Sequence, residues 1–423
     1  MEVEQFLESF SLNQPGDLLD SNPRRTIVDS ISLDGAWVKR FTNEFWTAGQ
    51  RKSNSLHEIS YRGCFKAELP QLFISLLSQP GDWVYDPFMG RGTTLVEAAL
   101  LGRRPAGNDI NPLSQALTAP RLKPPTLREI NARLKQVPWN DTLKADIDLS
   151  MFYSPATEGR IVSLRNYLAD RKAGQEEEDV DRWIRMTATN RLTGHSPGFF
   201  SVYTLPPNQA VSPEAQIKIN EKRNQTPPDR DVAAIILKKS KSLLSDLTDA
   251  SRRQLRTVAD QARLYCGPSE KASPIEAESV SLVVTSPPFL DVVQYEKDNW
   301  LRCWFNGFDA GVIGKSITMS KTVDGWRKTM AAVLMELARV LRSGGWFAFE
   351  VGEVKGGKVR LDEIVAPLGE AAGLACRGIV INQQVFTKTA NCWGVNNNTK
   401  GTNTNRVVLF HKRESNGQAT IRD

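Results

Sequence analysis

The chain has 423 residues and a formal net charge of +6, a length that suggests one large domain with an insertion or two domains. The mildly basic balance suits a polyanionic partner. Without a run of about eighteen apolar residues, the sequence predicts no membrane-spanning helix, and its acidic first ten residues lack a signal-peptide pattern. The five cysteines and three histidines are scattered, so we expect reduced thiols in a cytoplasmic protein and no metal site.

A glycine-rich turn follows the first strand that the pattern predicts. Residues 84–94 read VYDPFMGRGTT, and the helix-forming segment 93–101 begins where the glycines end. Gly90 and Gly92 allow the backbone to approach a ligand closely and to take a positive φ. A strand, a glycine turn and a helix N-terminus form the usual cradle for nucleotide-type cofactors. The next predicted strand ends in Asp109, about twenty residues after the loop, where a carboxylate can hold ribose hydroxyls.

The middle of the chain interrupts this pattern. Residues 124–262 alternate helical segments with stretches rich in Pro, Asn and Gln, which predicts a largely helical insertion. Within it, residues 231–256 are amphipathic and basic, and the acidic run Glu176–Asp179 is most simply a solvated face.

A second distinctive turn follows the apolar strand 280–284 and reads Thr285-Ser286-Pro287-Pro288-Phe289. Consecutive prolines remove two backbone donors, and the serine hydroxyl adds an acceptor. The Ser286 hydroxyl and the Pro287 carbonyl could accept both N–H groups of a planar amine while Phe289 stacks on its ring. An ordinary strand followed by a Pro-Pro loop would read the same way.

The last third of the chain returns to strands and helices. Strands are predicted near 263–269 and 346–351, an amphipathic helix over 326–341, and a final antiparallel pair over 377–386 and 407–412. Together these elements predict an α/β fold, a doubly wound and mostly parallel sheet with a reversed last strand and helices on both faces.

Taken together, the two turns resemble the DNA amino-methyltransferases. Residues 86–94 match "DPFxGxGTT" over its whole length. The form TSPP at 285–288 is usual in the N4-cytosine branch, whereas N6-adenine enzymes more often carry Asp or Asn before the prolines. The resemblance covers about residues 55–118 and 263–412. It implies a seven-stranded Rossmann-like methyltransferase sheet, S-adenosyl-L-methionine as cofactor and a cytosine flipped out of double-stranded DNA as substrate.

The same resemblance assigns roles to residues and segments. It implies a catalytic site of Ser286, Pro287, Pro288 and Phe289. It implies a cofactor site of Asp86, Pro87, Phe88, Gly90, Gly92, Thr93, Thr94, Asp109, Ile110, Gly267 and Thr285. The expected organisation is an N-terminal arm (1–54), a catalytic domain (55–123 and 263–413), the insertion (124–262) and a tail (414–423).

Several alternatives stay open. Either the insertion 124–262 or the Asn-rich segment 382–406 could read the DNA sequence. The product could be N6-methyladenine, or the substrate an RNA guanine. A non-catalytic DNA-binding protein and a dinucleotide oxidoreductase fit less well, and C5-cytosine chemistry would need a nucleophilic cysteine that the catalytic turn lacks. In a prokaryotic or phage setting, a cognate restriction endonuclease is the expected partner.

Overall fold

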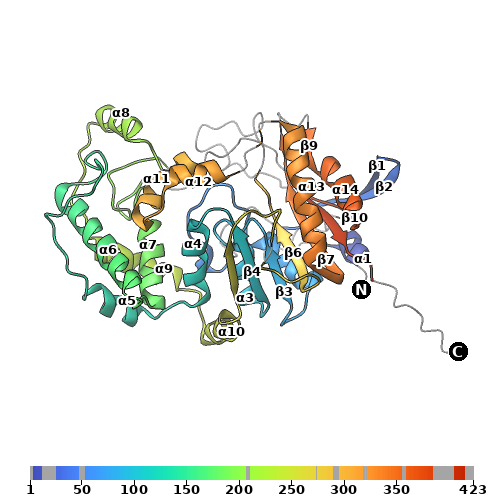
Figure 1. The fold of residues 1–423 in the computed structure, drawn as a ribbon, viewed down its shortest axis with the longest axis horizontal. Coiled ribbons are helices and arrows are strands. Elements are labelled where there is room, and N and C mark those ends of the chain that lie inside the picture. The colour runs from blue at the N-terminus through green and yellow to red at the C-terminus, as the bar shows by residue number, and fades with distance from the viewer. Residues whose placement is uncertain are drawn as a thin grey trace, which may run out of the picture.

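A nine-stranded sheet organises the structure, in the order β1-β2-β10-β11-β7-β6-β3-β4-β5 (Figure 1). The computed structural model describes residues 3–11, 25–46, 53–205, 210–272, 274–288, 295–317, 320, 322–354, 359–383 and 404–414. The strands of the large sheet are β1 (Ile27–Leu33), β2 (Ala36–Asn43), β3 (Trp83–Asp86), β4 (Arg104–Asp109), β5 (Arg263–Cys266), β6 (Val280–Thr285), β7 (Leu341–Val351), β10 (Ala375–Gln383) and β11 (Thr404–His411). The short strands β8 (Glu353–Val354) and β9 (Val359–Arg360) pair separately.

The centre of the sheet is parallel. Strands β5, β4, β3, β6 and β7 pair in parallel, whereas β11 runs antiparallel to both β7 and β10. The predicted doubly wound, mostly parallel sheet with a reversed last strand is therefore confirmed.

Helices cover both faces of this sheet. The helices of the described residues are α1 (Val3–Ser9), α2 (Glu68–Leu77), α3 (Thr93–Leu100), α4 (Leu113–Leu122), α5 (Leu127–Leu134), α6 (Pro155–Ala173), α7 (Asp179–Thr189), α8 (Pro213–Arg223), α9 (Val232–Leu243), α10 (Asp249–Ala259), α11 (Tyr295–Asn306), α12 (Ala310–Ser316), α13 (Val323–Val340) and α14 (Leu361–Ala371). Buried side chains of α13 and α14 pack on one face, and those of α2 and α3 pack on the other. Helix α13 shows why, since Met330, Val333 and Leu337 recur at helical spacing and are all buried.

The N-terminal segment differs from the predicted arm. Strands β1 and β2 form an antiparallel hairpin, and β2 pairs in parallel with β10. The large sheet therefore has two strands more than the predicted seven, and residues 27–43 belong to it. Helix α1 packs beside this hairpin, with Leu7 buried in the core.

The insertion is helical, as predicted, and contains α5 to α10. Its core is continuous with the rest of the molecule, because Trp183 and Ile236 belong to the same buried cluster as Val96 of α3, Leu117 of α4 and Leu301 of α11. The insertion is thus held against the helices that flank the sheet.

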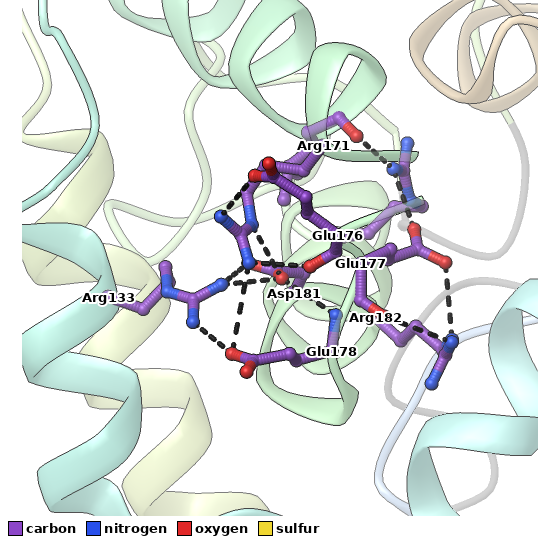
Figure 2. Close-up of polar contacts among 9 residues, drawn as sticks. Arg133, Arg171, Glu176, Glu177, Glu178, Asp181 and Arg182 are labelled. Carbon is purple, nitrogen blue, oxygen red and sulfur yellow. Dashed lines mark hydrogen bonds and ion pairs between the residues drawn. The ribbon is translucent and has the colours of Figure 1, made fainter. Parts of the chain in front are cut away.

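A cluster of charged side chains at the start of α7 stabilises the insertion through ion pairs between its own residues. Figure 2 shows Arg133 and Arg171 directed at the carboxylate of Asp181, whose side chain is fully buried. The preceding acidic run also pairs with arginines, including Glu177 with Arg185. The predicted solvated face is correct for Glu176, Glu178 and Asp179, which are largely exposed, but wrong for the mostly buried Glu177.

Replacing Asp181 tests this cluster. We expect Asp181→Asn to lower the free energy of unfolding by about 3 kcal/mol, because two guanidinium groups lose a buried shared partner. The matched control is Asp179→Asn, whose pair with Arg182 is exposed on both sides and should matter by less than about 1 kcal/mol. Equal urea-denaturation midpoints for the two variants would contradict the structural role given to Asp181.

Candidate active site

The two turns singled out in the sequence meet in one cavity at the carboxyl ends of β3, β4 and β6. It contains about 980 Å³ of empty space, part of it open to solvent. Six of the predicted site residues line it: Phe88, Gly90, Asp109, Ile110, Ser286 and Pro288. The fold therefore joins the glycine loop and the Ser-Pro-Pro turn into a single site.

The two glycines of the loop serve different purposes. Both have a positive φ, +50° at Gly90 and +76° at Gly92. A Cβ atom on Gly92 would lie 2.2 Å from the Thr118 hydroxyl of α4, so this position requires glycine for packing. A Cβ atom on Gly90 would lie 3.7 Å from the ring of Tyr61, which also lines the cavity. Glycine at 90 therefore leaves room at the cavity wall itself.

Asp109 holds the loop in shape from the end of β4. Its carboxylate accepts hydrogen bonds from the backbone N–H groups of Gly90 and Asn111, each at 2.9 Å. Burial raises the pKa of Asp109, and these backbone hydrogen bonds oppose that shift. Each carboxylate oxygen retains a second lone pair, so Asp109 can still accept a hydrogen bond from a ligand hydroxyl in the cavity.

Asp86 joins the ends of β3 and β6. It is 1% exposed and accepts hydrogen bonds from the Thr285 hydroxyl at 2.6 Å and from the Phe88 N–H at 3.0 Å. Burial in this apolar surrounding raises its pKa to about 7. Asp86 does not line the cavity and instead fixes the glycine loop against the Ser-Pro-Pro turn.

Other predicted cofactor residues also lie behind the cavity wall. The Thr94 hydroxyl donates to the Val284 carbonyl of β6 at 3.2 Å, and the Ser269 hydroxyl donates to the Pro87 carbonyl at 2.6 Å. Several predicted site residues are described by the structure but do not line the cavity: Asp86, Pro87, Gly92, Thr93, Thr94, Gly267, Thr285 and Pro287. These residues therefore do not form the cavity wall and instead support the loops that do.

Ser286 is coupled to a carboxylate that the sequence pattern did not reveal. Its side chain lies close enough to Glu350, near the end of β7, to lower the pKa of that carboxyl group. Glu350 is 6% exposed and accepts a hydrogen bond from the Asn405 side chain at 3.0 Å. Burial raises the pKa of Glu350, while Ser286 and Asn405 oppose the rise. Phe289, the last residue of the predicted catalytic turn, lies outside the described residues, as do 384–403 of the predicted recognition segment.

Trp326 was predicted only as the start of an amphipathic helix, yet it contacts the catalytic turn. Its indole N–H donates to the Pro288 carbonyl at 3.0 Å, and its side chain is buried at the cavity wall. The other lining residues, which the predicted site does not include, are Tyr61, Gly63, Asn111, Pro268, Ser269, Glu270, Ser316, Ile317, Ser320, Thr329, Met330 and Val333. The apolar residues at helical spacing on α13 predicted that this face is buried, but nothing in their pattern indicated a cavity.

Two features are absent from the part of the chain that the structure describes. It contains no group of His, Cys, Asp and Glu side chains arranged to hold a metal ion. No helix within it has the length and apolar character needed to cross a membrane.

The N-terminal part of this site matches a known family. Residues 29–117 match the family model described as DNA methylase. The chain is 34% identical over 80 residues to the Type II methyltransferase M.MthZI of Methanothermobacter thermautotrophicus, covering 18% of this chain and 22% of that protein. It is 35% identical over 91 residues to the Type II methyltransferase M.BglI of Bacillus subtilis, covering 21% and 25%. The matched part thus spans about a quarter of the length of these relatives.

Similarity to solved structures is weaker. A putative DNA modification methylase from Thermus thermophilus is 18% identical with a TM-score of 0.22, covering 35% of this chain and 52% of that one. The rRNA methyltransferase aviRa from Streptomyces viridochromogenes is 11% identical with a TM-score of 0.32, covering 86% and 91%. The description of the fold therefore rests on the strand order and directions given above.

The raised pKa of Asp86 predicts a pH dependence of stability. In the unfolded chain an Asp titrates near pH 4, whereas Asp86 in the fold titrates at about 7. Between these values the folded protein holds a proton that the unfolded chain releases. The free energy of unfolding should therefore fall as pH rises from about 4 to 7, by at most about 1.4 kcal/mol per pH unit.

Denaturation of wild type and Asp86→Asn across this range measures the effect. The variant keeps a side-chain acceptor for Thr285 but cannot ionise, so its stability should depend less steeply on pH. If both proteins show the same slope, Asp86 is ionised in the fold and the predicted shift is wrong.

Proposed function

Because residues 29–117 match the family model described as DNA methylase, we propose that the protein transfers a methyl group from S-adenosylmethionine to an exocyclic amino group of a DNA base. The observation that carries this proposal is the shared cavity, which Gly90 and Asp109 line on one side and Ser286 and Pro288 on the other. A methyl donor and an amine must meet within one cavity for direct transfer.

The cavity residues fit S-adenosylmethionine. The Asp109 carboxylate has free lone pairs for ribose hydroxyls, while Ile110 and Pro268 offer apolar surface to an adenine ring. Gly90 keeps the wall beside Tyr61 open. When bound, S-adenosylmethionine supplies an electrophilic methyl group.

Ser286 and Pro287 are the proposed acceptors for the two N–H groups of the target amine. The contact with Glu350 favours a Ser286 hydroxyl that donates its proton to the carboxylate, which leaves the oxygen lone pairs directed at the amine. Trp326 occupies the Pro288 carbonyl, so the Pro287 carbonyl is the one available for the substrate. Phe289 is the proposed stacking surface for the base.

In the proposed reaction Asp109, Ile110 and Pro268 would hold S-adenosylmethionine, and its electrophilic methyl group would be supplied to the lone pair of the amine nitrogen. Acceptors at Ser286 and Pro287 favour the positive charge that develops on the nitrogen. The surplus proton then leaves the methylated amine, and the Ser286–Glu350 pair gives it a path. The raised pKa of Glu350 makes its carboxylate a better proton acceptor than that of an exposed glutamate.

Among amine substrates we propose N4 of cytosine, because Ser286 stands before the two prolines as in the N4-cytosine branch. N6 of adenine is the alternative. We further propose that the protein acts as the modification enzyme that accompanies a restriction endonuclease. In this proposal, residues 124–262 or 382–406 recognise the DNA sequence.

Nucleoside analysis tests the function directly. We expect DNA from a host that expresses the protein to contain N4-methylcytosine, detected by mass spectrometry after digestion to nucleosides. DNA from a host that expresses Ser286→Ala is the control and should lack it. A dominant N6-methyladenine signal would correct the base, and no modified base in DNA would refute the proposed substrate.

Variants of Ser286 and Glu350 test the mechanism. We expect Ser286→Ala to lower kcat by about 100-fold or more, with little change in cofactor affinity. Glu350→Gln should lower kcat by about 10-fold and shift the acidic limb of the pH–kcat profile, because its amide cannot take up the proton. Asn405→Ala serves as a control, since it removes a neighbour of Glu350 but keeps the Ser286 contact. An unaltered pH profile in Glu350→Gln would show that Glu350 only supports the fold.

A further inference from the structure

A basic hollow lies between α9, α10 and the start of α5. It contains about 1060 Å³ of empty space open to solvent. Its lining consists of Thr126, Leu127, Lys241, Leu244, Ser245, Asp249, Arg252, Arg253 and Arg256. These nine residues carry four cationic side chains and one carboxylate, so half of the formal net charge of +6 is concentrated at one place.

The cations of the basic hollow are available to a partner. Lys241, Arg253 and Arg256 are exposed, and within the described parts of the chain none of the three makes an ion pair. Arg252 donates to the carbonyl of Pro124 at 3.3 Å. The arginines around Asp181 behave differently, since they are matched with carboxylates (Figure 2).

Two nearby carboxylates reduce this charge only in part. Asp249 lines the hollow. Glu129 is close enough for Arg256 and Arg252 to contribute to its lowered pKa, but the largest causes of that shift are hydrogen bonds from Thr126. Both the N–H and the hydroxyl of Thr126 donate to the Glu129 carboxylate at 2.7 Å. A net positive charge therefore remains on this surface.

The basic hollow lies at the opposite edge of the sheet from the cavity. Helix α10 packs beside Gly102, just before β4 begins, because a Cβ atom there would lie 3.0 Å from the Gln254 side chain. The cavity is at the other end of β4, at Asp109. Six residues of strand separate the two edges by about 20 Å, and Figure 1 shows α10 at the lower margin and α12 near the upper one.

We propose that the basic hollow binds the sugar–phosphate backbone of duplex DNA outside the base pair being modified, an inference that rests on the proposed function. Exposed, flexible cations around an open concave surface suit a polyanion that needs charge neutralisation without fixed geometry. A small anion would instead require buried donors at set positions. The separation from the cavity makes this contact independent of the target base.

Binding of a long duplex of mixed sequence, measured against salt concentration, tests the proposal. The test variant is Lys241→Gln with Arg253→Gln. The matched control is Lys135→Gln with Lys172→Gln, two exposed cations elsewhere on the insertion. The slope of log affinity against log salt should decrease in magnitude by about 2 in the test variant and by less than about 0.5 in the control. Equal slopes for the test variant and the wild type would overturn the proposal.

Two further measurements separate this inference from its alternatives. Inorganic triphosphate added at the same phosphate concentration should compete poorly with the duplex for the wild type; competition as strong as that of DNA would assign the hollow to a small anion and overturn the DNA contact. S-adenosylmethionine affinity and the melting temperature should be unchanged in the test variant. A wild type that shows the expected slopes but produces no methylated base would refute the proposed function and leave this surface assignment intact.

Discussion

The hydrogen bond between Asp86 and Thr285 is the contact on which the site depends. It joins the last residues of β3 and β6 at 2.6 Å in a buried position. From β3 the chain continues to β4 on one side, whereas β6 and β7 lie on the other, so this point is where the direction of strand succession reverses. Doubly wound sheets bind ligands at such points because the loops there diverge and leave a crevice.

Around that point the long insertion is accommodated without disturbing the sheet. Residues 124–262 enter after α4 and leave before β5, and their core is shared with α3, α4 and α11. The strands on either side of the insertion, β4 and β5, remain directly paired. An insertion placed in this way can enlarge the surface beside the cavity while the glycine loop and the Ser-Pro-Pro turn keep their relative positions.

The sequence predicted the parts of the structure that leave a local pattern. The glycine loop and the strand before Ser286 are each encoded within a dozen residues, and each strand of the reversed last pair leaves its own apolar run. The hairpin of β1 and β2 was not predicted from the sequence, because its place depends on pairing with β10, more than three hundred residues away. The roles of Trp326 and Glu350 at the site were not predicted either, because they also depend on contacts between distant parts of the chain. Each had a local explanation, as a helix or strand residue, that concealed its contact with the catalytic turn.

The contact between Ser286 and Glu350 bears on why serine can stand where related enzymes carry a carboxylate. An ionised Asp accepts strong, charge-assisted hydrogen bonds directly from an amine. In the proposed mechanism the carboxyl group lies one group further back, at Glu350, and a hydroxyl that donates to it becomes a better acceptor. Negative charge is then available to the amine in both arrangements. The choice of base must therefore depend on the shape of the pocket and on the distance at which the acceptor stands, rather than on the charge of the first residue in the motif.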